Sequence, residues 1–184
     1  MRAAIISTVL LHKAADKILK YVISKSRVPL VIDADGINVL AKSKTYLLEK
    51  HAPIILTPHI QEMARLTEKT KETIMKNPME EAKKFTEEYD ITLVLKDART
   101  IVTKNQELLY VNTSGNSGMA TGGSGDVLAG IIGGLIAQKM DVFEAAKLGV
   151  YLHGSAGDAA ARVKGSYSML ATDILDGIAE VTRG

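Results

Sequence analysis

The sequence predicts an α/β fold in which helices cover both faces of a sheet. Segments with helical spacing separate short apolar runs of the type that forms buried strands. Two further segments, 100–103 and 107–111, flank a polar triplet and predict a β-hairpin. A length of 184 residues fits one domain over residues 1–184, since domains typically have about 100–200 residues. The buried strands are expected at residues 28–32, 53–56 and 91–95.

The remaining elements follow from periodicity and from residues that favour helix starts. Thr57 is expected to cap a helix that has Pro58 in its first turn. Asp141 and Glu144 have the spacing of a capping box, and Thr172 is expected to cap the last helix. In chain order the sequence predicts a strand at residues 3–7 and helices at 13–24, 38–50, 80–89, 142–162 and 173–181.

Composition excludes several classes of protein. A net charge of +2 does not favour nucleic acid or a membrane surface as a partner. The absence of cysteine excludes disulfides and thiol chemistry. Because no apolar run reaches the ~20 residues of a membrane span, we expect a cytoplasmic protein without a membrane or nucleic-acid partner.

The most informative segment is Gly-Asn-Ser-Gly-Met-Ala-Thr-Gly-Gly-Ser-Gly-Asp at residues 115–126, followed by the apolar stretch 127–137. Glycines let the backbone approach a ligand, and the N-terminus of a helix favours an anion such as phosphate. Asp126 could then accept a proton from a substrate hydroxyl, as phosphoryl transfer requires. Glycines also permit tight helix packing, and Asp126 could be only a cap. The entropy cost of ordering so many glycines favours the functional interpretation.

Three other polar clusters follow predicted strands, at Asp33 and Asp35, at 57–62 and at 96–100. Ligands of α/β sheets bind outside the carboxyl ends of the strands, so these clusters and the glycine segment are expected to converge. Asp33 and Asp35 also suit a turn, and we do not rank them as catalytic.

Four motifs together resemble one family. They are Val-Ile-Asp-Ala-Asp-Gly (31–36), Leu-Thr-Pro-His-Ile-Gln-Glu (56–62), Val-Leu-Lys-Asp-Ala-Arg-Thr (94–100) and the glycine segment 115–126. In this order and spacing the sequence is similar to the ADP/ATP-dependent NAD(P)H-hydrate dehydratases, which are ribokinase-like. The resemblance runs from about residue 28 to the C-terminus. It implies a three-layer ribokinase-like domain of which the N-terminal portion is missing.

The resemblance implies an activity and roles for particular residues. ADP or ATP, with Mg²⁺, would phosphorylate the hydroxyl of hydrated NADH or NADPH (NAD(P)HX), and loss of phosphate would restore the dihydronicotinamide. Asp126 would be the base and contact the substrate, His59 would bind the substrate, and Glu62 would organise Mg²⁺ through water. The residues implied to bind the nucleotide are Lys96, Asp97, Ala98, Arg99, Thr100, Gly122, Gly123, Ser124 and Gly125.

Each of these roles has a structural alternative. His59 could be a polar residue in a capped turn, Glu62 a solvated side chain, and Lys96 a solvated charge at a strand end. Asp97 stands where the family commonly has glycine, so its carboxylate should face the base or solvent and not phosphate. A structural role is preferred for the other histidines, His12, His51 and His153.

The start of the chain departs from the family. Residues 6–11 lack the Gly-Pro-Gly loop that family members carry there, so the chain looks like their C-terminal two-thirds. It could be a fragment, the product of an incorrect start, or a shortened homologue. We therefore expect self-association into a homo-oligomer, through the first strand or the apolar stretch 127–137, and an epimerase domain or protein as a partner. A small-molecule kinase of the same superfamily and a non-catalytic nucleotide-binding remnant are the alternatives.

Overall fold

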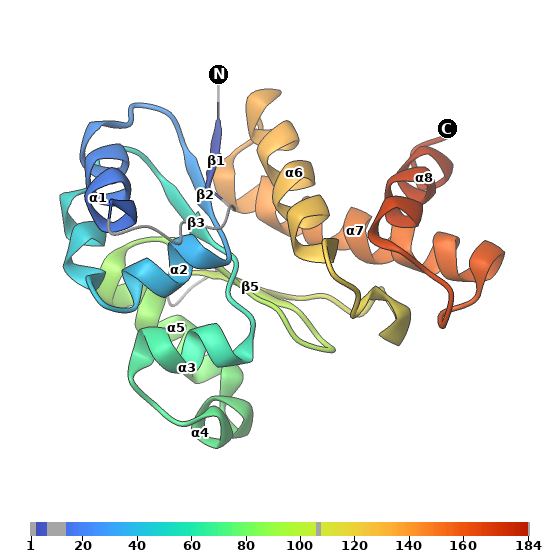
Figure 1. Ribbon diagram of the computed structural model, residues 1–184, viewed down its shortest axis with the longest axis horizontal. Helices are drawn as coiled ribbons and strands as arrows, with labels where there is room; N and C mark the ends of the chain where they lie inside the picture. The colour runs from blue at the N-terminus through green and yellow to red at the C-terminus, as the bar shows by residue number, and fades with distance from the viewer. Residues whose placement is uncertain (1–2, 7–13, 106–107, 184) are drawn as a thin grey trace.

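Six strands form one mixed sheet in a computed structural model that describes residues 3–6, 14–105 and 108–183 (Figure 1). The strand order follows the chain, from β1 to β6. The first four strands are parallel, whereas β5 and β6 form the expected antiparallel hairpin beside β4. This architecture confirms the predicted α/β class. The strands are β1 (Ala4–Ile6), β2 (Leu30–Ile32), β3 (Ile54–Leu56), β4 (Thr92–Leu95), β5 (Ile101–Lys104) and β6 (Leu108–Val111).

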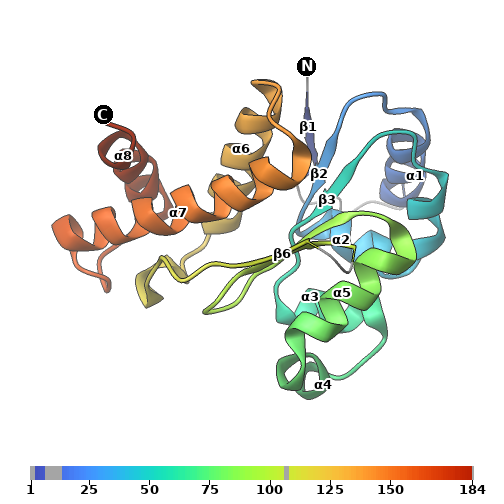
Figure 2. The ribbon, with the colours of Figure 1, turned by 180° about the vertical axis from the view of Figure 1, so that it is seen from behind.

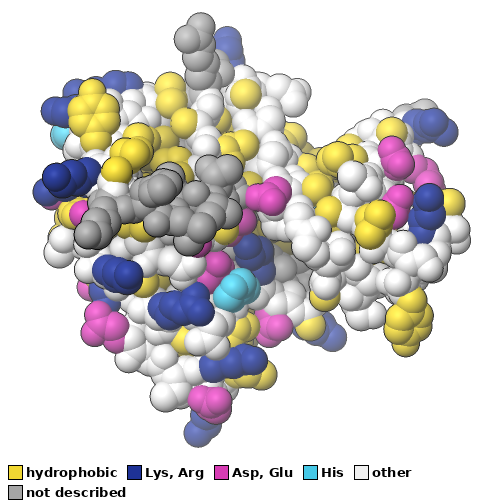
Figure 3. Space-filling model, in the orientation of Figure 1, with side chains coloured by type: hydrophobic (Ala, Val, Ile, Leu, Met, Phe, Trp, Pro, Cys, Tyr) yellow, Lys and Arg dark blue, Asp and Glu magenta, His cyan; other side chains and the backbone are white. Residues whose placement is uncertain are grey.

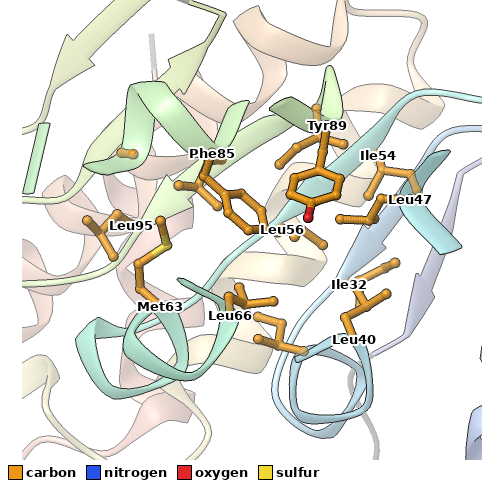
Figure 4. Close-up of a cluster of buried hydrophobic side chains, with 14 of the residues drawn as sticks. Ile32, Leu40, Leu47, Ile54, Leu56, Met63, Leu66, Phe85, Tyr89 and Leu95 are labelled. Atoms are coloured by element: carbon orange, nitrogen blue, oxygen red, sulfur yellow. The ribbon is translucent and has the colours of Figure 1, made fainter. Parts of the chain in front are cut away.

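One face of the sheet is covered by the helices that precede β4 (Figures 1 and 2). Alternate strand residues such as Ile32 and Leu56 point to this face and pack with Met63 and Phe85 in the larger apolar core (Figure 4). The helices of this layer are α1 (Ala15–Lys25), α2 (Asp35–Leu40), the 3-10 helix η1 (Lys44–Glu49), α3 (Ile60–Thr67), α4 (Lys71–Lys76) and α5 (Pro78–Tyr89).

The other face is covered by α6 (Ser124–Ala137) and α7 (Val142–Lys164). The intervening strand residues Val31, Ile55 and Val94 point to these helices in a second buried cluster. Because both faces are covered, β2 and β3 are apolar at every position and β4 at every position but Thr92, and this explains their apolar runs in the sequence.

The C-terminal half of α7 extends beyond the sheet and carries α8 (Ala171–Val181) on its side (Figures 1 and 2). A small third cluster around Ala156, Met169 and Ile174 joins these helices. The 3-10 helix η2 (Ser117–Met119) also contacts α7. None of the helices in the described parts of the chain is long and apolar enough to cross a membrane.

One predicted helix differs from the structure. The single helix expected at 38–50 is instead α2, which begins at Asp35, followed by η1. The break at residues 41–43 lets both pieces turn buried leucines, Leu40 and Leu47, toward the same core. The expected strand 3–7 and helix 13–24 are present as β1 and α1, although residues 7 and 13 lie outside the described residues.

The predicted helix caps are only partly correct. Thr57 does not cap α3, because the chain stays extended for two more residues and His59 occupies the N-cap. Asp141 caps α7, but Glu144 pairs with Lys147 and does not complete a capping box. Thr172 lies inside α8, whose N-cap position is Leu170. The amide of Leu170 donates to Asp173 Oδ2 at 2.8 Å.

Candidate functional site

Three polar side chains follow directly on β2, β3 and β4. The extended hydrogen bonding continues through Asp33, whose amide donates to Ile6 O at 2.9 Å, and through Thr57, whose amide donates to Ile32 O at 3.2 Å. Asp33 and Thr57 each stand two residues after a strand residue that faces α6, and so does Lys96. Alternation along a strand therefore turns all three toward α6.

Asp33 and Lys96 form a buried ion pair. Lys96 Nζ donates to Asp33 Oδ1 at 2.7 Å, and the two side chains are 22% and 4% exposed, respectively. Taking two charges out of water is costly unless they are paired, so each group holds the other in place. Lys96 is thus not a solvated charge, and Asp33, for which a turn was the alternative role, lies at the site with the other polar clusters. Asp35 does have a local role, because its Oδ1 accepts from Asn38 Nδ2 at 3.3 Å.

The glycine loop, defined here as residues 115–125, ends on this ion pair. A Cβ atom at Gly125 would lie 3.1 Å from Asp33 Oδ2 and 3.4 Å from Lys96 Nζ. Gly123, the N-cap of α6, has φ +90°, a conformation that favours glycine, and gives the helix no side-chain cap. Around the missing Cβ of Gly122 there is open space. The first turn of α6 therefore offers backbone amides beside the Lys96 ammonium, which suits an anion.

Asp126 lies in the first turn of α6, next to Gly125 in the chain, and is exposed. An exposed carboxylate at this position can meet a ligand whose phosphate lies on the same helix turn. On the face shown in Figure 3, charged side chains of both signs and a histidine gather near the centre.

His59 and Glu62 form the capping box of α3. His59 Nδ1 accepts from the amides of Gln61 and Glu62 at 3.1 and 3.2 Å, and the amide of His59 donates to Glu62 Oε2 at 2.8 Å. Nδ1 is therefore unprotonated, and Nε2 carries the proton of the neutral ring. The His59 side chain is 50% exposed, whereas that of Glu62 is 7% exposed. Glu62 is therefore buried and is not the solvated side chain that was the alternative interpretation of this residue.

The backbone segments that carry His59 and Lys96 are paired at the edge of the sheet. His59 pairs with Lys96 as an isolated parallel bridge, and the amide of Lys96 donates to Pro58 O at 2.8 Å. The connection from Lys96 to β5 is short and leaves Asp97, Ala98 and Arg99 exposed. Thr100 Oγ1 donates to Asp97 O at 3.4 Å. Segments 33, 57–62, 96–100 and the glycine loop thus meet at one edge, as the sequence predicts.

Thr57 is 1% exposed, and its Oγ1 is the buried side-chain oxygen that lacks a hydrogen-bond partner among the described residues. An unpaired buried hydroxyl costs about 1–3 kcal/mol. This cost is removed when a water or ligand atom reaches the hydroxyl. The sequence placed Thr57 in a converging polar cluster but gave it the role of a helix cap, so its buried, unpaired hydroxyl was missed.

His153 of α7 is a second residue that sequence reasoning left aside. Its Nε2 lies 3.3 Å from Ser124 Oγ at the start of α6. Burial, together with the nearby positive charge of Lys96, lowers the pKa of His153 to about 4, although a hydrogen bond with Ser124 opposes the shift. The ring is therefore neutral at pH 7. The place of His153 at the site is revealed only by the contact between α6 and α7, because no motif surrounds His153 in the sequence.

The donor groups fit Mg²⁺ held chiefly by a ligand. The described residues contain no group of three or more His, Asp or Glu side chains suited to a metal ion. Mg²⁺ commonly uses one or two carboxylates, waters and substrate phosphates instead of an all-protein cage. Asp33, Glu62 and Asp126 are among the carboxylates at this edge of the sheet. The arrangement therefore fits a nucleotide-bound Mg²⁺ better than a resident metal ion.

The sequence and the structure both match known proteins. Residues 4–180 match the family model described as NAD(P)H-hydrate dehydratase. The chain is 46% identical over 166 residues to the bifunctional NAD(P)H-hydrate repair enzyme of Moorella thermoacetica, covering 90% of this chain and 31% of that protein. It is 45% identical over 132 residues to the ADP-dependent (S)-NAD(P)H-hydrate dehydratase of Neisseria meningitidis, covering 71% of this chain and 45% of that protein. The chain thus spans less than half the length of these curated relatives.

The fold matches that of a solved dehydratase. An ADP/ATP-dependent NAD(P)H-hydrate dehydratase from Bacillus subtilis, co-crystallised with ATP and Mg²⁺, superposes with a TM-score of 0.87 at 30% identity, covering 98% of this chain and 63% of that chain. A ribokinase-like superfamily protein from Enterococcus faecalis gives a TM-score of 0.81 at 32% identity, covering 97% of this chain and 62% of that chain. The fold is therefore ribokinase-like.

Proposed function

The chain belongs to the NAD(P)H-hydrate dehydratase family, and we propose that it uses ADP or ATP to dehydrate hydrated NADH or NADPH. One observation carries the proposal. Gly125 lies directly over the Asp33–Lys96 ion pair at the start of α6, with Asp126 next to it. This arrangement places amides and an ammonium for a phosphate beside a carboxylate for a hydroxyl proton, and kinase-type chemistry needs both.

The proposed reaction has two steps. Asp126 takes the proton of the substrate hydroxyl while the hydroxyl oxygen bonds to the terminal phosphorus of the nucleotide, and the bond from phosphorus to the nucleotide breaks. The carbon–oxygen bond then breaks, phosphate leaves with the bonding electrons, and loss of a proton from the neighbouring carbon restores the ring double bond. With ATP, the products are the dihydronicotinamide, ADP and phosphate.

The other site residues take binding roles in this proposal. His59 contacts the hydrated dinucleotide with its half-exposed side chain, whose Nε2 lies 3.5 Å from Glu62 Oε1. The residues proposed to hold the nucleotide are the Lys96–Thr100 turn and Gly122–Gly125. Mg²⁺ neutralises phosphate charge when it is bound with the nucleotide, and Glu62 orients its waters. Lys96 is then shared between Asp33 and the transferring phosphate.

The setting of the enzyme is also a proposal. Relatives are described as bifunctional repair enzymes, which supports cooperation with an epimerase domain or protein that interconverts the forms of the hydrate. A cytoplasmic location suits a repair reaction on free NADH and NADPH.

The direct test mixes the protein with hydrated NADH, Mg²⁺ and either ADP or ATP. Recovery of absorbance at the NADH wavelength is expected, and it should require the nucleotide. Formation of a phosphorylated hydrate without recovery of NADH would instead indicate a kinase. If neither product forms, the nucleotide-binding remnant is the better description and the proposal fails.

Replacing the proposed base supplies the matched variant. Asp126→Asn should lower turnover by about 10²–10⁴-fold, the usual contribution of a general base. Nucleotide affinity should stay close to that of the wild type, because it depends mainly on the backbone amides and Lys96. Kinetics and calorimetry measure the two quantities separately. Wild-type turnover in Asp126→Asn would show that Asp126 is only part of the helix start.

A further inference from the structure

We propose that Asp158, in the middle of α7, is a positioning residue that fixes the first half of the glycine loop and thereby places Gly122–Gly125. The inference rests on the proposed function for its kinetic consequences, but its structural part stands on separate contacts. Among the site residues described above, only His153 shares a helix with Asp158.

The Asp158 carboxylate holds two consecutive residues at the start of the glycine loop. The amide of Gly115 donates to Asp158 Oδ2 at 2.9 Å, and Asn116 Nδ2 donates to Asp158 Oδ1 at 3.0 Å. Asn116 Nδ2 also donates to Gly157 O at 3.0 Å, while its Oδ1 accepts from the amide of Gly118 at 3.0 Å. Every polar atom of the Asn116 side chain is therefore used in fixing the loop.

The surface of α7 beneath the loop has no room for side chains. A Cβ atom at Gly154 would lie 2.8 Å from the backbone of Ser114, and one at Gly157 would lie within 2.8 Å of three Met119 side-chain atoms. These two glycines, one helical turn apart, let the loop lie directly on the helix. Gly115 itself has φ +106°, a conformation that side chains disfavour.

The same stretch of α7 also holds the far end of the loop. His153 lies 3.3 Å from Ser124 Oγ, in the first turn of α6. Residues 153–158 of α7 thus contact the glycine loop at both of its ends. Of these contacts, the two bonds to Asp158 are charge-assisted and are therefore the stronger ones.

The consequence for catalysis follows from geometry. A loop of many glycines has a large conformational entropy when it is not held. Without Asp158 the loop would sample many conformations. Only a fraction of these would place the amides near Gly125 where they can bind the nucleotide phosphate. Asp158 should therefore act on nucleotide affinity and turnover, and hardly on binding of the hydrated dinucleotide at His59.

The test uses the variants Asp158→Asn and Asn116→Asp and their combination. In Asp158→Asn, the new amide group faces either Asn116 Nδ2 or the amide of Gly115, so two donors oppose each other in either orientation. In the double variant the donor and the acceptor are exchanged and the bond between positions 116 and 158 is restored, whereas the bond from position 116 to Gly157 O is lost. Asp176→Asn, the same change on an exposed part of α8, is the matched control.

We expect Asp158→Asn to raise the nucleotide KM about tenfold or more, the change that corresponds to loss of one charge-assisted hydrogen bond. The KM for the hydrated dinucleotide should change less than about twofold. Hydrogen exchange at the amides of Gly115 and Gly118 should become faster. The double variant should recover most of the loss, and Asp176→Asn should behave as the wild type.

Two results would overturn the proposal. One is a wild-type nucleotide KM and wild-type exchange in Asp158→Asn. The other is a lower melting temperature in Asp158→Asn with no recovery in the double variant, which would mean that Asp158 only stabilises the fold. If the wild type itself does not turn over, the proposed function fails, and the exchange measurement still decides the role of Asp158.

Discussion

At the scale of single residues, one buried ion pair organises the site. Asp33 and Lys96 come from neighbouring parts of the sheet edge, 63 positions apart in sequence, and each is buried against the other. Gly125 completes the arrangement, because any larger residue would press on both charged groups. The requirement for glycine therefore comes from this tertiary contact as well as from the ligand.

His153 gives the site a measurable dependence on pH. Burial lowers its pKa to about 4, below the value near 6.5 of an unfolded chain. Above pH 6.5 the ring is neutral in both states and has no effect. As the pH falls from 6.5 to 4, the unfolded chain binds a proton that the folded protein excludes, so this group lowers the free energy of unfolding.

His153→Gln, which cannot titrate, should remove this contribution. Between pH 6.5 and 4 the wild type should lose about 3 kcal/mol more unfolding free energy than the variant. Urea denaturation of both proteins at several pH values measures this difference. The contribution of the carboxylates to the pH dependence cancels, because both proteins contain the same carboxylates. Parallel curves for the two proteins would contradict the assigned pKa.

The sequence predicts some of these residues better than others. Lys96, His59 and Gly125 stand in motifs, and the structure brings them to one edge. Asp33 suits a turn in the sequence, and its ion pair with Lys96 is revealed only by the three-dimensional structure. His153 and Asp158 lie on a helix that carries no motif, and their contacts join segments about 30 and 43 positions apart. Contacts of this kind depend on how helices pack, which residue spacing does not encode.

At the scale of elements, glycines decide how closely the C-terminal helices approach. A Cβ atom at Gly177 of α8 would lie 2.2 Å from Ala156 O of α7, a backbone atom that cannot move aside. By contrast, Gly134 of α6 has no atom within 4 Å of its missing Cβ. These two glycines stand inside helices but are in opposite situations.

Substituting alanine at these two positions should therefore change the free energy of unfolding in opposite directions. Gly177→Ala should lower the free energy of unfolding by about 1–3 kcal/mol, the typical cost of overpacking. Gly134→Ala should raise it by about 0.5–1 kcal/mol, because alanine is the better helix former. Urea denaturation of both variants measures these values. If both stabilise the protein, the close contact of α7 and α8 is wrong.

Element types were easier to predict than element ends. The buried strands and the hairpin follow directly from apolar runs and their turn residues. The break between α2 and η1 does not, because residues 38–50 lack a glycine or proline at which a helix would stop. Tertiary packing of Leu40 and Leu47 overrides local helix preference there.

At the scale of the whole molecule, the β1 edge of the sheet exposes an apolar side chain, as the β6 edge does at Leu108. Among the described residues β1 pairs on one side only, with β2, and Ile5 is 45% exposed. Open strand edges pair readily with other chains. We propose that this edge accounts for the self-association that the sequence predicts.

Light scattering after size-exclusion chromatography should show a mass that rises with concentration for the wild type. Ile5→Lys should shift the protein toward the monomer, since charge on an edge strand disfavours pairing. Ile18→Lys on α1, where the side chain is 50% exposed, is the control and should leave association unchanged. A wild type that remains monomeric at high micromolar concentration would contradict the proposal.

The central claim is that a nucleotide phosphate binds where α6 starts, over the Asp33–Lys96 pair. Calorimetric titration of ADP with Mg²⁺ into the wild type and Gly125→Val tests it most directly, with Gly134→Ala as a control on the same helix. We predict saturable binding to the wild type and to Gly134→Ala. Gly125→Val should fold but not bind, because its side chain would occupy the position of the phosphate. Equal affinity for Gly125→Val and the wild type would contradict the claim.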